Sequence, residues 1–182
     1  MNLLVTGGAR SGKSAFAERL AMSLADQALY IATGQAFDRE MQERIALHRQ
    51  RRNEAEYAWE TIEEPHDLAG LMDRLPAGKT VLVDCLTLWL SNVLLSVEDR
   101  GDRQEILEAE ISRLAQSAEA YDGTLIMVTN EVGDGIVPEY ALGRLYRDLA
   151  GMMNAGLARQ CNQVFLVTAG IPIELKSREY KC

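Results

Sequence analysis

Cysteine is scarce in this chain, and its spacing is not that of a disulfide framework or a metal site. The three cysteines, Cys85, Cys161 and Cys182, are odd in number, widely separated and without a CxxC pair. This pattern excludes a disulfide-stapled secreted fold and a cysteine zinc site. Reduced thiols of this kind are typical of a cytoplasmic protein.

Long apolar runs and an excess of positive charge are also missing. The longest apolar run, around Leu86–Leu95, contains Ser91 and Asn92 and is too short to cross a bilayer. Met1–Ala9 lacks the basic and apolar stretches of a signal peptide, so we expect a cytoplasmic protein. The 19 basic and 27 acidic residues give a net charge of −8, which argues against nucleic acid as the main partner.

The chain shows no interdomain linker, internal repeat or low-complexity tract. Its 182 residues are 47% apolar and 25% charged, the composition of a globular protein with a substantial core. We therefore expect residues 1–182 to form one nucleotide-binding domain, for the reason given next.

What the chain does contain, close to its start, is a glycine-rich loop between an apolar run, Leu3–Val5, and a segment of helical periodicity. The loop consists of Gly7, Gly8, Ala9, Arg10, Ser11, Gly12, Lys13 and Ser14. Strand, glycine loop and helix in this order form a phosphate-binding P-loop. The glycines allow the tight turn, Lys13 can reach the β- and γ-phosphates, and the Ser14 hydroxyl can ligate Mg²⁺. This motif predicts a protein that binds a nucleoside triphosphate.

Apolar runs and helical patterns alternate along the rest of the chain. Expected strands are Asn2–Thr6, Ala28–Ala32, Trp59–Ile62, Thr80–Asp84, Thr124–Val128 and Val164–Val167, the last followed by a tail. Expected helices are Lys13–Ala25, Arg39–Arg52, Asp67–Leu75, Leu86–Leu95, Gln104–Tyr121 and Glu139–Gln160. The alternation predicts an α/β fold, a P-loop NTPase-like (RecA-like), mostly parallel sheet with helices on both faces.

Polar segments follow several of the expected strands. The glycine loop, Thr33-Gly34, Asp84 and Thr129–Gly135 all lie at carboxyl ends of strands, where open α/β sheets bind ligands. Asp84 is the last residue of its expected strand. P-loop proteins carry an acidic residue at such a position, where it helps to hold Mg²⁺. The loop Thr129–Gly135 either contacts a ligand or simply connects two elements.

A basic island interrupts this acidic chain on the expected helix Arg39–Arg52. His48 continues the inward stripe of that helix, and it is followed by Arg49, Gln50, Arg51 and Arg52. One interpretation is a solvated helix face. The other is a histidine kept neutral, and hence nucleophilic, by neighbouring cations that also bind the triphosphate it attacks.

These motifs together resemble those of one family, the bifunctional adenosylcobinamide kinase/adenosylcobinamide-phosphate guanylyltransferases of cobalamin biosynthesis. The resemblance runs from Leu3 to about Lys176. It is carried by Val5–Ser14, Tyr30–Thr33, Glu40-Met41 with Arg44-Ile45 and His48, Val128–Gly133, Gly135–Pro138, and Arg147-Asp148 with Gly151 and Asn154.

The resemblance implies two reactions. The first phosphorylates adenosylcobinamide with ATP or GTP, and the second transfers GMP from GTP, through a guanylylated histidine, to the resulting phosphate. By position, His48 and Lys13 are then the catalytic residues, and Ser14 and Asp84 hold Mg²⁺. Besides the glycine loop, the implied nucleotide contacts are Ala32, Thr33, Gly34, Arg49, Gln50, Arg51, Arg52, Glu63 (with Glu64 as a substitute) and Asp84. The family also implies a homotrimer.

Two other functions are compatible with the motifs. A single-activity P-loop kinase of another small molecule would make no use of His48. A nucleotide-binding switch or assembly ATPase would act through a partner, and the absence of an NKxD motif disfavours a regulatory GTPase.

Overall fold

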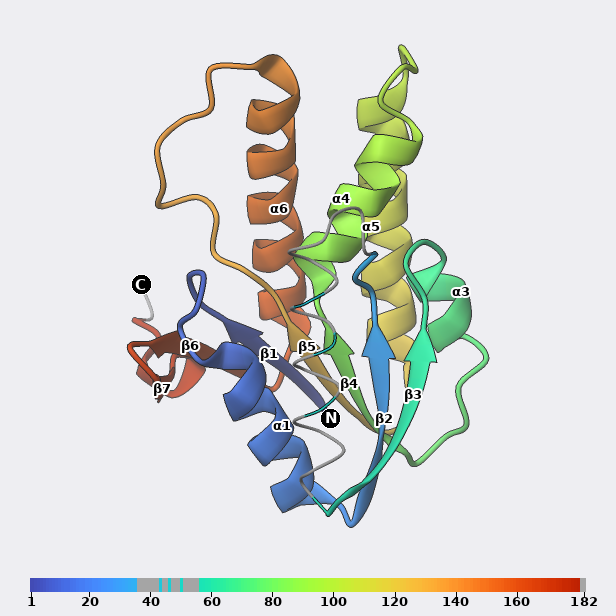
Figure 1. Ribbon diagram of the computed structural model, residues 1–182, viewed down its shortest axis with the longest axis vertical. Coiled ribbons are helices and arrows are strands. Elements are labelled where there is room, and N and C mark those ends of the chain that lie inside the picture. The colour runs from blue at the N-terminus through green and yellow to red at the C-terminus, as the bar shows by residue number, and fades with distance from the viewer. Residues whose placement is uncertain (36–42, 44–45, 47–49, 51–55, 181–182) are drawn as a thin grey trace.

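The computed structural model describes residues 1–35, 43, 46, 50 and 56–180. One seven-stranded sheet organises the described chain (Figure 1). Its strands are β1 (Asn2–Thr6), β2 (Gln27–Ala32), β3 (Ala58–Glu63), β4 (Thr80–Asp84), β5 (Thr124–Val128), β6 (Gln163–Thr168) and β7 (Ile171–Glu174). The described helices are α1 (Lys13–Leu24), α3 (Leu68–Met72), α4 (Leu86–Ser96), α5 (Arg103–Ala120), α6 (Ala141–Gln160) and a 3-10 turn, η1 (Lys176–Arg178).

The strand order is β3-β2-β4-β5-β1-β6-β7. All neighbours pair in parallel except β6 and β7, which are antiparallel. The predicted α/β, P-loop NTPase-like fold with a mostly parallel sheet is confirmed. Strand β5 lies between β1 and β4, so one strand separates the strand that ends in Asp84 from the strand that leads into the glycine loop.

Helices cover both faces of the sheet, and each face has its own core. Because side chains alternate along a strand, Leu3 and Val5 of β1 point to one core and Leu4 to the other. The first core lies under α1, and the second, larger core lies under α3, α4, α5 and α6 (Figure 1). Continuously apolar strands are therefore buried on both sides, as parallel strands usually are.

Helix α1 packs against the sheet through small side chains. Helical spacing places Phe16, Leu20 and Leu24 on one face, but the fully buried apolar side chains are Ala17 and Ala21, and Leu24 is exposed. Phe16 and Leu20 pack beside them as partly buried neighbours. Small alanines on the inward face let the helix axis approach the sheet, so the larger side chains lie at the flanks.

The chain after β6 was expected to be a tail, and this expectation is wrong. A tight turn at Ala169-Gly170 returns the chain as β7, antiparallel to β6. The segment reads Ile-Pro-Ile-Glu, and a proline is uncommon inside a strand. Strand β7 tolerates Pro172 because it lies at the edge of the sheet, where a missing N–H breaks no second ladder.

The remaining predicted helices are only partly comparable with the structure. The helix predicted over Arg39–Arg52 lies outside the described residues except for Glu43, Ala46 and Gln50, which are helical and exposed. Helix α6 begins at Ala141, two residues later than predicted. None of the described helices is long and apolar enough to cross a membrane.

Candidate active site

Helix α1 presents an uncapped N-terminus to the glycine loop. Its N-cap residue is Gly12, at φ 92°, and no side chain caps the helix. The first N–H groups of a helix have no partners within the helix, so here they are available to an anion held by the loop. Lys13 adds a full positive charge at the same place: it is buried, and its Nζ donates to the Gly8 carbonyl at 3.1 Å.

The loop is closely packed against the end of β6. Gly7 has φ 157°, and a Cβ there would lie 2.4 Å from the Val167 carbonyl oxygen and 2.7 Å from Ser11 Oγ. The Gly170 N–H donates to the Ser11 carbonyl at 2.9 Å. The end of β6 and the β6–β7 turn therefore pack against the glycine loop and hydrogen-bond to it. Sequence reasoning missed this support because it predicted no hairpin.

The predicted binding residues of the neighbouring strands lie in one register row. Glu63 of β3 pairs with Ala32 of β2, and Ala32 pairs with Asp84 of β4. Asp84 is opposite Val128 of β5, which is opposite Val5 of β1, just before the glycine loop. The parallel register thus brings the candidate residues of four strands to the same edge, as their positions at strand ends predicted.

Asp84 and Thr33 fix the strand ends of β4 and β2 to each other. Tyr30 Oη donates to Asp84 Oδ2 at 2.9 Å, which orients the half-buried carboxylate. Thr33 is fully buried, and its Oγ1 donates to the Cys85 carbonyl at 2.7 Å and accepts from the Cys85 N–H at 2.8 Å. The Thr33 hydroxyl is therefore occupied by the backbone, so its role is to hold the site's framework.

Asn92 of helix α4 forms hydrogen bonds to two segments that follow strands at the candidate ligand-binding end of the sheet. It is buried, and its Nδ2 donates to the Thr33 carbonyl at 2.8 Å and to the Pro65 carbonyl at 3.1 Å. Its polar side chain therefore links the segment after β2 to the segment after β3. The sequence offered one signal for this role, a lone amide in a helix that is otherwise nearly all apolar.

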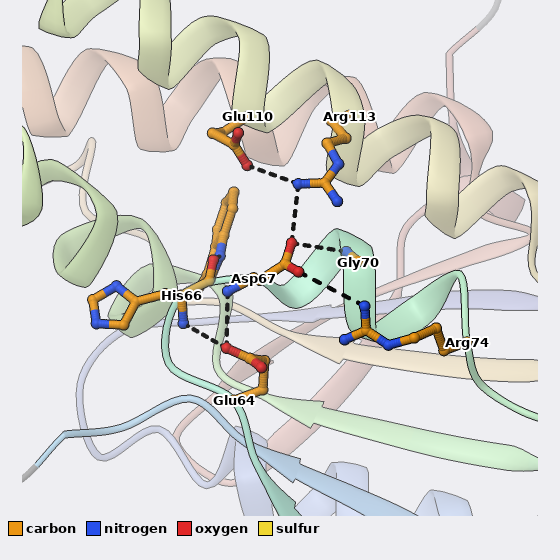
Figure 2. Close-up of polar contacts among 8 residues, drawn as sticks. Glu64, His66, Asp67, Gly70, Arg74, Glu110 and Arg113 are labelled. Atoms are coloured by element: carbon orange, nitrogen blue, oxygen red, sulfur yellow. Dashed lines mark hydrogen bonds and ion pairs between the residues drawn. The ribbon is translucent and has the colours of Figure 1, made fainter.

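The segment after β3 is held by a second polar cluster (Figure 2). Glu64 Oε1 accepts from the N–H groups of His66 and Asp67 at 3.0 and 2.8 Å. Asp67 caps α3 through the Gly70 N–H and pairs with Arg113 of α5 at 2.9 Å. Glu64 thus stabilises a turn, whereas Glu63 remains in the register row. His66 is exposed.

The loop after β5 is anchored to the glycine loop and to α6. Its Glu131 N–H donates to the Gly7 carbonyl at 3.1 Å, and its Thr129 N–H donates to the Val5 carbonyl at 2.9 Å. Asn154 of α6 accepts from Thr129 Oγ1 at 2.7 Å and donates to the Asn130 carbonyl. The loop therefore borders the glycine loop and is fixed to α6.

Cys85 lies beside this edge as a buried thiol. Burial, followed by the charge of Asp84, raises the pKa of its thiol to about 11. The thiol therefore stays protonated at neutral pH, and its Sγ lies 3.2 Å from Thr87 Oγ1. Thr87 also accepts from Asn130 Nδ2 at 2.7 Å, so these side chains join α4 to the loop after β5.

Two predicted sets of site residues have different outcomes. The structure brings the glycine loop, Ala32–Gly34, Glu63 and Asp84 to one edge. His48, Arg49, Arg51 and Arg52 lie outside the described residues, and Gln50 is exposed on its helix. Within the described part of the chain, no group of three or more His, Cys, Asp or Glu side chains could hold a metal ion. One carboxylate, Asp84, and one hydroxyl, Ser14, nevertheless fit Mg²⁺, which proteins usually bind by few side chains together with substrate phosphates.

A P-loop in this setting, with an acid on a nearby strand and an anchored loop beside it, defines an α/β enzyme that binds a nucleoside triphosphate and acts at its phosphates. The particular family follows from comparison with known proteins. The chain belongs to the CobU family, cobinamide kinase / cobinamide phosphate guanyltransferase, whose model matches residues 3–175. It is therefore a bifunctional kinase and guanylyltransferase, and the predicted family is confirmed.

Individual relatives are similar over nearly their whole length. The bifunctional adenosylcobalamin biosynthesis protein CobP of Pseudomonas aeruginosa is 45% identical, covering 97% of this chain and 98% of the relative. CobU proteins of the same description from Escherichia coli K12 and Salmonella typhimurium LT2 are 42% and 38% identical, each covering 97% of this chain and 100% of the relative. The match extends far beyond the P-loop, which disfavours the single-activity kinase and the partner-driven switch.

Proposed function

We propose that this protein acts in adenosylcobalamin biosynthesis, phosphorylating adenosylcobinamide and then converting the phosphate to adenosylcobinamide-GDP. The observation that carries the proposal is the uncapped N-terminus of α1, with Gly12 and the buried Lys13 over a glycine loop. Such a site binds a triphosphate through backbone N–H groups and one ammonium. We also propose, by family resemblance, a homotrimer in the cytoplasm.

In the kinase step, the hydroxyl oxygen of the acceptor forms a bond to the γ-phosphorus of ATP or GTP. The bond from that phosphorus to the β,γ-bridging oxygen breaks, the nucleoside diphosphate leaves, and the hydroxyl proton passes to solvent. Lys13 and the first N–H groups of α1 bind the phosphate oxygens, on which negative charge is concentrated. Asp84 and Ser14 would hold Mg²⁺, which supplies further neutralisation of phosphate charge.

In the guanylyl step, a neutral ring nitrogen of His48 forms a bond to the α-phosphorus of GTP while the bond to the β-phosphate oxygen breaks. Pyrophosphate leaves, and the guanylylated histidine is a phosphoramidate. A phosphate oxygen of the acceptor then attacks the same phosphorus, and the electron pair of the P–N bond returns to His48. The remaining proposed nucleotide contacts are Ala32, Thr33, Gly34, Glu63 and Arg49–Arg52, Thr33 through its backbone because its hydroxyl is occupied.

The first experiment is to incubate the protein with Mg²⁺ and GTP labelled at the α-phosphate, without corrinoid. We expect label on the denatured protein that is acid-labile and base-stable, because a P–N bond to histidine hydrolyses in acid. His48→Ala should abolish this label while the protein remains folded by circular dichroism. Lys13→Ala should lower the rate of cobinamide phosphorylation about 10²-fold or more, because it removes a charged contact to the transferred group.

The outcomes separate the two halves of the proposal. Label that persists in His48→Ala would mean that another residue is the nucleophile. If no label forms under any condition while cobinamide is still phosphorylated, the alternative of a single-activity P-loop kinase would stand instead.

A further inference from the structure

The loop between β5 and α6 carries a surface that the nucleotide chemistry does not use. We propose that Ile136, Val137 and Tyr140, rimmed by Asp134 and Glu139, bind the corrin ring of the acceptor. This inference rests on the proposed function, since it names where that function's second substrate lies.

The loop is fixed next to the phosphate site. Its first half donates to the Gly7 carbonyl of the glycine loop through the Glu131 N–H, at 3.1 Å. Glu131 Oε1 accepts from the Gly133 N–H at 2.8 Å, and Arg147 of α6 donates to the Gly133 carbonyl. The loop's position relative to the transferred phosphate is therefore set by hydrogen bonds on both sides.

The second half of the loop is also held, although it is far from the core. Arg144 Nη1 donates to the carbonyls of Pro138 and Glu139, at 3.2 and 2.6 Å. The Tyr140 ring lies against Gly143, where a Cβ would be 2.6 Å from Tyr140 Cε2. The ring thus rests on the first turn of α6. In Figure 1 this loop extends outward beside α6, above the edge of the sheet that carries the glycine loop.

Despite this fixed backbone, the loop exposes large apolar side chains. Ile136 is 97% exposed, Val137 56% and Tyr140 68%. Single exposed apolar residues are ordinary on protein surfaces. Three within five residues, on a loop anchored to the glycine loop, are more than isolated exposed residues and can offer apolar contact to a ligand.

The charge of the loop selects among possible occupants. Glu131, Asp134 and Glu139 lie in the loop, and no Lys or Arg occurs between residues 129 and 143. The two arginines of α6 that contact the loop, Arg144 and Arg147, donate to its backbone carbonyls. A second nucleotide polyphosphate would be repelled by these acids. Adenosylcobinamide instead offers a large ring with methyl-bearing faces and carries one net positive charge, from cobalt(III) bound by a monoanionic corrin and one carbanion ligand. Apolar contact at the centre and acids at the rim complement such a cation.

The test compares the double variant Ile136→Ser/Val137→Ser with the parent protein and with Leu24→Ser. Leu24, the last residue of α1, is also an exposed aliphatic residue, so it controls for the loss of exposed apolar surface. We expect the KM for adenosylcobinamide in the double variant to rise at least tenfold, while the KM for GTP changes less than twofold. Tyr140→Ser should act in the same direction, and Ile136→Leu/Val137→Leu should restore binding.

A second measurement does not depend on turnover. Equilibrium dialysis against adenosylcobinamide, followed by its visible absorbance, should show the same weakening, and Asp134→Asn/Glu139→Gln should weaken binding further. An unchanged Kd in the double variant would overturn the inference. The inference would also be overturned if light scattering gave the double variant a smaller mass than the parent protein and both KM values changed. The three apolar side chains would then contact a second copy of the chain rather than the corrin ring. A parent protein that does not phosphorylate adenosylcobinamide at all would instead refute the proposed function.

Discussion

Gly7 and Gly8 are adjacent in the glycine loop, but only one of them has room for a side chain. A Cβ on Gly7 would lie 2.4 Å from the Val167 carbonyl oxygen, and the residue has φ 157°. A Cβ on Gly8 would meet nothing within 4 Å. The sequence pattern treats the two glycines alike, whereas the packing of β6 beneath the loop distinguishes them.

The pair gives a matched prediction at the residue scale. Gly7→Ala should raise the KM for the nucleotide tenfold or more, because the loop or the end of β6 must shift to avoid overlap with a backbone atom. Gly8→Ala should change it less than threefold, since the backbone N–H is kept and the new methyl group points into open space. Steady-state kinetics with GTP measure both. Equal effects in the two variants would show that the contact with Val167 does not set the loop's shape.

Residue identity points to candidate site residues wherever chemistry restricts the choice. Glycine, lysine and serine in the loop, and an acid at the end of β4, are required by phosphate and metal binding, so their positions were readable. Asn92 and Thr33 were less readable as supports, because a buried hydroxyl or amide bonded to backbone carbonyls depends on which segments the fold brings together. Their roles come from tertiary contacts, which a single sequence does not display.

At the scale of elements, the central strands were predictable and the last hairpin was not. Strands β1, β4 and β5 are continuous aliphatic runs, and their predicted bounds agree with the structure. Strand β7 is four residues long and contains Pro172, so neither period nor composition marks it. It forms because β6 offers an unpaired edge and because Glu174 secures its end.

Glu174 gives a prediction of pH dependence for this hairpin. Its carboxylate accepts from the N–H groups of Val164, Lys176 and Ser177. Hydrogen bonds from Ser177, its side chain first and its backbone next, lower the pKa of this carboxyl from 4.5 to about 2. Because the folded-state pKa is depressed, the stabilisation is fully present above pH 4.5 and is lost as the pH falls toward 2.

Glu174→Gln should therefore lower the urea midpoint of unfolding at pH 7, and the gap from the parent protein should narrow as the pH falls below about 4.5. Glu179→Gln removes a nearby exposed carboxylate from the same chain end and should change the midpoint little at either pH. Urea titrations at pH 7, 5 and 4 make the comparison. A gap that is constant over this range would mean that the charge of Glu174 does not hold the hairpin.

At the scale of the whole molecule, two borders of the sheet have different surfaces. One is formed by the carboxyl ends of the parallel strands, beside the glycine loop, and the other is the outermost strand, β7. The parallel register collects Glu63, Ala32 and Asp84 in one row beside the glycine loop. Strand β7, by contrast, is the last strand of the sheet and has a neighbour on one side only. Ile171, Ile173 and Leu175 alternate along this edge, and all three are exposed.

The short strand β7, with its proline, is poorly suited to backbone pairing with another chain, but its three exposed apolar side chains favour side-chain contact with one. We therefore expect the proposed homotrimer to use this edge. Light scattering should give three times the chain mass of 20.2 kDa. Ile173→Asp should reduce that mass, because a carboxylate would have to be buried without a partner. Leu24→Asp, at a position of equal exposure on α1, should leave it unchanged.

The same edge lies close to the nucleotide site, so assembly and catalysis should be coupled. The β6–β7 turn donates to the Ser11 carbonyl of the glycine loop through the Gly170 N–H. A chain that loses its neighbour at β7 also loses support for that turn. The KM for GTP in Ile173→Asp should therefore rise in proportion to the fraction of dissociated chains. A trimer that Ile173→Asp leaves intact would place the subunit interface elsewhere, and a parent protein of single-chain mass would refute the trimer itself.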